Sequence, residues 1–303
     1  MALRDYLVGE VAEDYSDGEL TRREALRRLG LLGLSATAAS TLLSACAAAE
    51  PAPQPAPAPT SAPPAPVDVP GQAQSVGRGQ EIRFAGPAGE LIGAWAAPTD
   101  DQPTAAVLVI HENRGLTEHF YDLVGRLAGA GYGTLCVDLL SDQGGTAALA
   151  DPAQAPTALA DKPEEALIAD LRAGIDELGR RVPGAKVGVV GFCFGGGMTW
   201  QLLQAGETRM AAAVPFYGPA PDPADFRQAT AAVLGIYAAL DDRVNASRER
   251  AEAALRDAGL TYQIRTFDGA DHAFFNDTGA RYNPDAAQQA YTEMMDWFGR
   301  HLA

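Results

Sequence analysis

The chain has 303 residues, of which 47% are hydrophobic, with 3 Cys, 21 Pro and a formal net charge of −16 at pH 7. This length and apolar content suit one large domain or two small ones with a sizeable core. So few cysteines exclude a disulfide-stapled scaffold. The acidic balance argues against a nucleic-acid partner, because affinity for the phosphate backbone comes from Lys and Arg.

Residues 1–46 have the pattern of an export signal. Basic residues around Arg22 and Arg23 precede residues 29–45, a run without charge that is rich in Leu, Ala and Gly. Adjacent arginines before such a run are typical of the bacterial twin-arginine route, with general secretion as the alternative. The run ends in Leu43-Ser44-Ala45-Cys46, which resembles the lipobox of bacterial lipoprotein precursors. We therefore expect lipidation of Cys46; cleavage without lipid and an uncleaved membrane anchor are the alternatives.

An Ala/Pro-rich linker is expected over residues 47–76. Ala and Pro alternate from Pro51 onward, and such a tract favours extended polyproline II geometry without a packed core. After a lipid-bearing Cys46 it would hold a domain of residues 77–303 away from a membrane. The expected location is therefore that of an exported, membrane-anchored lipoprotein on the periplasmic or extracellular face.

From residue 81 onward, short apolar runs alternate with amphipathic stretches. In chain order, the expected strands are 81–84, 91–96, 105–110, 133–139, 185–190, 211–216, 232–237 and 261–267. The expected helices are 117–129, 163–181, 196–204, 246–258 and 284–301, and residues 141–161 are expected to be rich in loops. This alternation predicts an α/β fold, with a mostly parallel central sheet and helices on both faces.

The strongest local motif is Gly191-Phe192-Cys193-Phe194-Gly195, between an expected strand and an expected helix. It has the form of the nucleophile elbow G-x-S-x-G, with Cys in place of Ser. The glycines give room at a strained turn, and a helix N-terminus there lowers the pKa of a thiol. The Phe194 N–H is the first expected oxyanion donor. The alternative for Cys193 is a small buried apolar residue, which is the role expected for Cys136, and no disulfide is predicted.

A nucleophile of this kind needs a base and an acid, which follow it along the chain in the order acid and then His. His272 comes just after the last expected strand, where an imidazole can reach the elbow. The acid is expected on the loop after the preceding strand, which contains both Asp241 and Asp242. Either carboxylate can orient an imidazole, and position in the sequence does not choose between them.

Five segments resemble the dienelactone hydrolase family of α/β-hydrolases and occur in the family's order. They are Ile110-His111-Glu112-Asn113-Arg114-Gly115, Gly191-Phe192-Cys193-Phe194-Gly195-Gly196, Phe216-Tyr217-Gly218, Leu240-Asp241-Asp242-Arg243-Val244-Asn245 and Gly269-Ala270-Asp271-His272-Ala273-Phe274. The similarity covers about residues 81–303 and implies the α/β-hydrolase fold. It also implies a triad of Cys193, His272 and Asp241, rather than Asp242.

The resemblance also implies roles for two further residues. Glu112 matches the family's carboxylate that hydrogen-bonds the nucleophilic thiol before substrate arrives, and the Asn113 N–H matches the second oxyanion donor. A thiolate is readily oxidised outside the cytoplasm, so a Cys193 thiol held neutral against Glu112 would be protected. A structural carboxylate is the alternative for Glu112. His111 is expected to pack or hydrogen-bond beside the site.

Arg114, Tyr217 and Asn276 are the candidates for substrate binding. Asn276 stands four residues after His272, where enzymes that open the namesake lactone hold its carboxylate with an arginine. The resemblance therefore implies ester or lactone hydrolysis without specifying that lactone. For Arg114, a surface salt bridge is the alternative, and Tyr217 is expected either to line the cleft or to donate a hydrogen bond to substrate.

Together these patterns predict a hydrolase of ester, lactone or thioester bonds that uses no cofactor. No metal is expected, because the sequence has no His-x-x-His or Cys-x-x-Cys spacing. The expected partners are a small-molecule substrate and the membrane, and the protein is expected to be a monomer. The alternatives are a tethered binding lipoprotein that keeps the fold without turnover and a thiol redox sensor, which the lack of a resolving Cys disfavours.

Overall fold

The computed structural model describes residues 3–16, 18, 20–46, 69–103 and 105–303, which divide into two compact units, residues 1–68 and 69–303. The first unit contains helices α1 (Leu3–Ser16), α2 (Arg22–Leu31) and α3 (Ala36–Cys46), which contact one another. The Thr21 hydroxyl accepts a hydrogen bond from the Glu24 N–H and so caps the first turn of α2. Most of the expected linker, residues 47–68, lies outside the described residues.

The apolar run expected over residues 29–45 is divided between two helices. α2 ends at Leu31 and α3 begins at Ala36, and between them Gly33 has a φ of 87° that favours glycine. Arg22 and Arg23 are exposed at the start of α2. Among the helices of the described residues, none combines the length and the apolar character that a membrane span requires.

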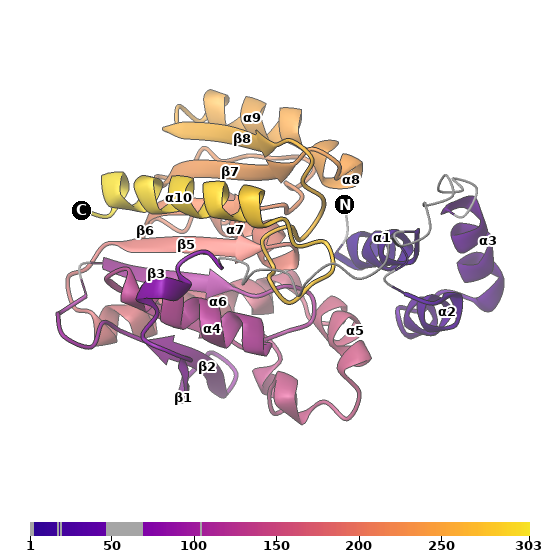
Figure 1. Ribbon diagram of the computed structural model, residues 1–303, viewed down its shortest axis with the longest axis horizontal. Coiled ribbons are helices and arrows are strands. Elements are labelled where there is room, and N and C mark those ends of the chain that lie inside the picture. Colours follow the sequence, from indigo (N-terminus) through magenta and orange to yellow (C-terminus); the bar gives the residue numbers. More distant parts are fainter. Residues whose placement is uncertain (1–2, 17, 19, 47–68, 104) are drawn as a thin grey trace, which may run out of the picture. The chain divides into compact units, whose positions relative to one another are not determined.

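The second unit is built around one sheet of eight strands in the order β1-β2-β4-β3-β5-β6-β7-β8 (Figure 1). Strands β1 and β2 pair antiparallel, β2 pairs antiparallel with β4, and the other neighbours are parallel. The predicted mostly parallel sheet is therefore confirmed. The strands are β1 (Gln80–Ala85), β2 (Glu90–Ala96), β3 (Ala105–Ile110), β4 (Tyr132–Val137), β5 (Val187–Phe192), β6 (Met210–Phe216), β7 (Ala232–Ala238) and β8 (Tyr262–Phe267).

Helices pack on both faces of the sheet, as predicted. Every residue of β3, β4 and β5 is buried, which is typical of parallel strands covered on two sides. Gly174 in α6 lies against the side chains of Leu108 and Val137, whereas Gly188 in β5 lies against Phe298 of α10 on the opposite face. The main flanking helices are α4 (Glu118–Gly129), α6 (Glu164–Arg181), α7 (Phe194–Gln204) and α10 (Pro284–His301).

Two segments differ in detail from the sequence expectation. The loop-rich segment after β4 contains short helices: η2 (Ser141–Gln143), η3 (Thr146–Ala148), η4 (Pro152–Gln154) and α5 (Ala155–Ala160). The helix expected over residues 246–258 is α9 (Arg248–Asp257), and a short helix that was not expected, α8 (Asp242–Asn245), precedes it. The Asp241 carboxylate accepts from the Val244 N–H and starts α8 early, and the Ser247 hydroxyl donates to the Val244 carbonyl at its end.

The second unit begins at Val69, ahead of the expected start at residue 77, because the chain from η1 (Gln72–Gln74) to residue 79 packs on α4. The Val76 N–H donates to the Gly125 carbonyl at 3.2 Å. A Cβ at Gly125 would lie 1.6 Å from the Gly77 carbonyl oxygen, and one at Gly129 would lie 1.7 Å from that of Gln74. Two glycines on α4 thus make the groove that receives this backbone.

The strand ends place the candidate residues together. Because β3, β5, β6, β7 and β8 run parallel, their carboxyl ends share one edge of the sheet (Figure 1). Ligands of open α/β sheets bind at this edge.

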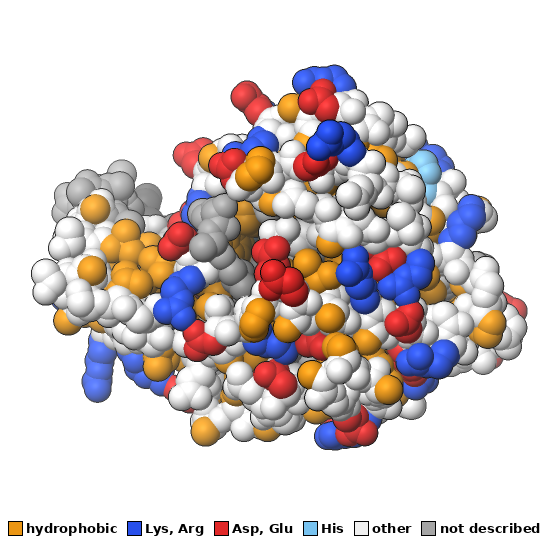
Figure 2. Space-filling model, turned by 180° about the vertical axis from the view of Figure 1, so that it is seen from behind, with side chains coloured by type: hydrophobic (Ala, Val, Ile, Leu, Met, Phe, Trp, Pro, Cys, Tyr) orange, Lys and Arg blue, Asp and Glu red, His pale blue; other side chains and the backbone are white. Residues whose placement is uncertain are grey.

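On the face drawn in Figure 2, acidic and basic side chains are interspersed over the surface.

Candidate active site

Cys193 lies at the sharp turn between β5 and α7. Its backbone has φ 56° and ψ −117°, an unfavourable conformation for a residue with a side chain. A Cβ at Gly191 would lie 2.0 Å from the Gly195 carbonyl oxygen, and one at Gly195 would lie 2.2 Å from that of Ile110. The turn closes only because both positions lack a side chain. Phe194 is the first residue of α7, so its N–H has no acceptor within the helix.

His272 and Asp241 form a buried pair on the loops after β8 and β7. The His272 Nδ1 lies 2.6 Å from Asp241 Oδ2, and the side chains are 2% and 0% exposed. Burial by itself raises the pKa of Asp241, but the charge and hydrogen bond of His272 and the Val244 N–H outweigh it and lower that pKa below its ordinary value. The structure pairs the imidazole with Asp241, whereas Asp242 is exposed.

Tyr217 lies between this pair and Glu112. It follows β6 with a φ of 33°, and its ring centroid is 5.2 Å from that of His272 in an edge-on arrangement. Its hydroxyl donates to Glu112 Oε1 at 3.4 Å. Burial raises the pKa of Tyr217 well above its ordinary value, and the charges of Glu112 and Cys193 raise it further. The Tyr217 phenol thus lies close to both His272 and Glu112.

The Glu112 carboxylate is 8% exposed and is held by a second donor. Asn276 Nδ2 donates to Glu112 Oε2 at 2.8 Å. The structure therefore brings Asn276 to the site, but its amide contacts a carboxylate of the protein. Of the other candidates near Glu112, Asn113 is partly buried and Arg114 is exposed.

His111 fixes the peptide unit between Glu112 and Asn113. The Leu139 N–H donates to His111 Nε2 at 3.1 Å, so the proton is on Nδ1, which donates to the Glu112 carbonyl at 2.7 Å. Burial lowers the pKa of His111 below its ordinary value and favours this neutral ring. Because C=O and N–H point in opposite directions across a trans peptide, the bond directs the Asn113 N–H away from the His111 ring.

A nucleophile elbow, a buried imidazole–carboxylate pair and a carboxylate loop thus share one edge of an α/β sheet, and a sequence model of the dienelactone hydrolase family matches residues 92–302. The chain belongs to the dienelactone hydrolase family. Two curated relatives, from Methylorubrum extorquens and Yersinia pestis, are each named "Putative carboxymethylenebutenolidase" and are each 30% identical to it. The matches cover 68% and 70% of this chain and 75% and 85% of the relatives.

Solved structures agree with this assignment. The crystal structure of a "Putative Dienelactone Hydrolase" from Klebsiella pneumoniae is 28% identical and aligns with a TM-score of 0.65, over 73% of this chain and 98% of that chain. An acylaminoacyl peptidase from Pyrococcus horikoshii, 17% identical with a TM-score of 0.58, covers 74% of this chain and 41% of its own and shares the fold alone. The predicted α/β-hydrolase fold and the hydrolase class are therefore confirmed.

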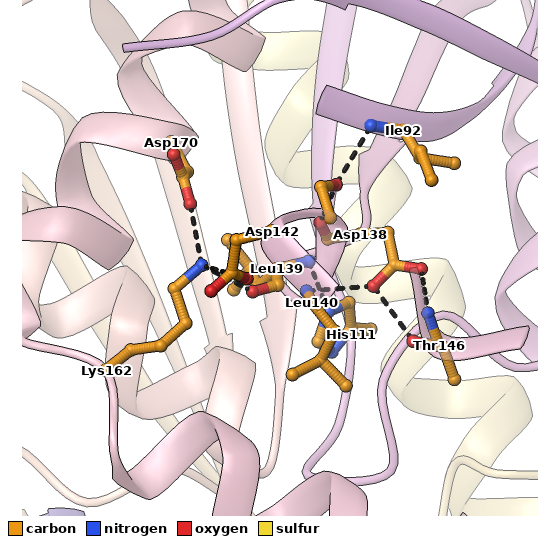
Figure 3. Close-up of polar contacts among 10 residues, drawn as sticks. Ile92, His111, Asp138, Leu139, Leu140, Asp142, Thr146, Lys162 and Asp170 are labelled. Atoms are coloured by element: carbon orange, nitrogen blue, oxygen red, sulfur yellow. Dashed lines mark hydrogen bonds and ion pairs between the residues drawn. The ribbon is translucent and has the colours of Figure 1, made fainter. Parts of the chain in front are cut away.

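In this dienelactone hydrolase family member, a polar network after β4 supports the His111 ring (Figure 3). Asp138 accepts from the Leu140 N–H at 3.0 Å and from the Thr146 N–H at 2.6 Å. Lys162 Nζ donates to the Leu139 carbonyl at 2.8 Å and also contacts Asp142 and Asp170. These bonds hold the Leu139 N–H where it can donate to His111.

Sequence patterns missed one buried cluster near the site. Asp277 lies between His119 Nδ1, at 2.6 Å, and Arg126 Nη2, at 2.7 Å, and the side chains of His119 and Arg126 are 1% and 2% exposed. The sequence does contain a signal for this cluster. His119 and Arg126 are seven residues apart and therefore share one face of α4, a helix whose other buried side chains are mostly apolar.

Proposed function

We propose that this protein hydrolyses ester, lactone or thioester bonds of small molecules through a triad of Cys193, His272 and Asp241. The observation that carries the proposal is the 2.6 Å contact between His272 and Asp241, on loops that share one sheet edge with the elbow of Cys193. The Tyr217 ring contacts the His272 ring and its hydroxyl donates to Glu112, so Tyr217 links the buried pair to the loop after β3.

In the proposed reaction, Asp241 accepts the Nδ1–H of His272, so Nε2 is the nitrogen that takes the thiol proton. The thiolate attacks the substrate carbonyl, and the Phe194 and Asn113 N–H groups stabilise the oxyanion. Collapse expels the alcohol or thiol, which takes the proton back from the imidazole. Water, activated by the same imidazole, then hydrolyses the acyl-enzyme and regenerates the Cys193 thiol.

Glu112 supplies an additional control on the nucleophile. Its carboxylate accepts from Tyr217 and Asn276, and Glu112 and Cys193 are both buried. A like charge nearby disfavours the thiolate, so the resting thiol stays neutral and less open to oxidation.

The substrate class follows from the same residues. Asn276, where an arginine would bind a substrate carboxylate, instead donates to Glu112. An uncharged amide is a poor partner for a carboxylate compared with a guanidinium. We therefore favour neutral esters and lactones as substrates, with Arg114 and Tyr217 kept as candidates for binding the rest of the molecule.

A panel of p-nitrophenyl esters, aryl lactones and thioesters tests this function on the purified protein. The expected result is turnover of neutral esters or lactones that continues after dialysis against a metal chelator. A panel that includes both neutral and carboxylate-bearing substrates measures the preference directly. Absence of turnover across the whole panel would contradict the proposed activity and favour a binding role.

We also propose that the mature protein is an exported lipoprotein anchored through Cys46. The support is the order of exposed Arg22 and Arg23, the uncharged run and Cys46 along the sequence. Expression in a bacterium fed an alkyne fatty acid is expected to label the wild type in the membrane fraction, and Cys46→Ala to abolish the label. Equal labelling of both proteins would reject the anchor, and a change of both arginines to lysine tests the export route.

A further inference from the structure

The segment that follows His272 is tied to α4 through a single side chain. Asp277 accepts from His119 Nδ1 at 2.6 Å with one oxygen and from Arg126 Nη2 at 2.7 Å with the other. Both donors are at least 98% buried, and the Asp277 side chain is 12% exposed. The contact joins residues more than 150 positions apart, so it fixes the loop after β8 to a helix of the other half of the sheet.

This contact is a charged one. Burial by itself raises the pKa of Asp277, but the hydrogen bond and charge of His119 and the charge of Arg126 outweigh it and lower that pKa to about 2. Asp277 is therefore ionised at every pH at which an esterase is assayed. The Arg126 guanidinium, 2% exposed, has this carboxylate as its ion partner, so each charge stabilises the other in the interior.

Asn276, the residue before Asp277, connects this ion pair to the active site. The Asn276 Oδ1 accepts from the Thr278 N–H at 3.0 Å and from the Thr278 hydroxyl at 2.7 Å, which fixes the orientation of the amide. Its Nδ2 therefore faces Glu112 Oε2, to which it donates at 2.8 Å. Hydrogen bonds therefore join the segment Asn276–Thr278 on one side to α4 and on the other to Glu112.

We propose that Asp277 is a positioning residue that, clamped by His119 and Arg126, holds the Asn276 amide on Glu112 and so keeps that carboxylate beside the Cys193 thiol. The proposal rests on the proposed function, because it assigns Glu112 an effect on the nucleophile. Asp277 contacts neither substrate nor reacting atoms. The groups that face Glu112 are Asn276, the Tyr217 hydroxyl after β6 and His111 after β3.

The consequence is a shift in the pH at which Cys193 becomes reactive. With the clamp intact, the fixed Glu112 carboxylate repels a thiolate. Without the clamp, Glu112 is held by the Tyr217 hydroxyl through a long contact of 3.4 Å and moves away from the thiol, so the thiolate forms at lower pH. Loss of one nearby like charge of this kind shifts a titration by about one pH unit.

The test is the pH dependence of Cys193 alkylation by iodoacetamide in the full-length protein, followed by mass spectrometry of the peptide that contains Cys193. Asp277→Asn removes the clamp charge, Asn276→Ala removes the donor to Glu112, and Arg126→Lys loosens the clamp while keeping its charge. We expect the midpoint to fall by about one pH unit in the first two variants and by less in the third.

Glu207→Gln is the matched control. Glu207 is another buried carboxylate, 5% exposed, and it forms ion pairs with Arg172 and Arg209. It precedes the amino end of β6, at the edge of the sheet opposite the candidate site. A purely structural cost lowers the melting temperature in both Asp277→Asn and Glu207→Gln, whereas only Asp277→Asn is expected to move the midpoint. If Asp277→Asn does not fold, Arg126→Lys tests the clamp.

Midpoints that stay at the wild-type value in Asn276→Ala and in the folded clamp variants, or that move equally in Glu207→Gln, reject the proposal. Alkylation needs no substrate, so the clamp is tested even if no ester on the panel is hydrolysed. Conversely, hydrolysis that depends on Cys193 together with unmoved midpoints rejects the clamp and leaves the proposed function intact.

Discussion

Cys193→Ala is expected to lower kcat for aryl-ester hydrolysis by about 10⁴-fold or more, because the proposed mechanism passes through a thioester on this residue. The backbone N–H groups and the imidazole remain, so a small residual rate above that in water is expected. The measurement is initial-rate kinetics with a p-nitrophenyl ester that the wild type hydrolyses. Incubation with a slowly hydrolysed ester is expected to add the acyl mass to the wild type and not to the variant.

Cys136→Ala is the control for this substitution. Cys136 lies in β4, and burial raises the pKa of its thiol well above the ordinary value, so it is unreactive at neutral pH. Its loss is expected to leave kcat within about twofold of the wild type, because it is outside the proposed machinery. Full activity in Cys193→Ala would show that the nucleophile is another group.

Asp241→Asn is expected to lower kcat by about 10⁴-fold with little effect on the fold. The amide can keep the bond to the Val244 N–H through its oxygen, so the cap of α8 is retained. An amide NH₂ facing His272 Nδ1, however, favours the tautomer with the proton on Nε2, which cannot accept the thiol proton. Circular dichroism checks the fold, and initial-rate kinetics with the same ester measures kcat.

Asp242→Asn is the control for Asp241→Asn. Asp242 is exposed at the start of α8, whereas the buried His272 pairs with Asp241. It is expected to retain wild-type kcat, because solvent screens its charge. Equal losses in both variants, or a loss below tenfold in Asp241→Asn, would contradict the triad.

Most of the fold could be predicted from local patterns. Strands such as β3 and β5 are short, wholly apolar runs between turn residues, and α10 occupies the same residues, 284–301, that its apolar periodicity predicts. Errors are concentrated where side chains contact the backbone of another segment. The carboxylate of Asp241 caps α8, which begins before the apolar pattern of α9. Two glycines of α4 leave room for the backbone that precedes β1, so residues 69–79 pack as part of the domain.

The candidate site was predictable to the same degree and for the same reason. Cys193 could be predicted because its glycines are adjacent in sequence and the turn geometry requires them. The environment of Glu112 could not, because its donors come from Tyr217 and Asn276, which are separated from it by 105 and 164 positions. No local pattern states which side chains meet across such distances.

The sequence by itself determined the alternation of strands and helices, the position of the elbow and the set of residues at the ends of the strands. These depend on backbone sterics and on the burial of apolar side chains, which act over a few neighbouring residues. Position in the sequence did not choose between Asp241 and Asp242; the family resemblance implied Asp241, and the structure pairs His272 with it. Only the tertiary structure directed the Asn276 amide to Glu112 and joined Asp277 to α4. Such choices depend on hydrogen bonds and charges brought together by the packed sheet, where burial makes each unpaired polar group costly.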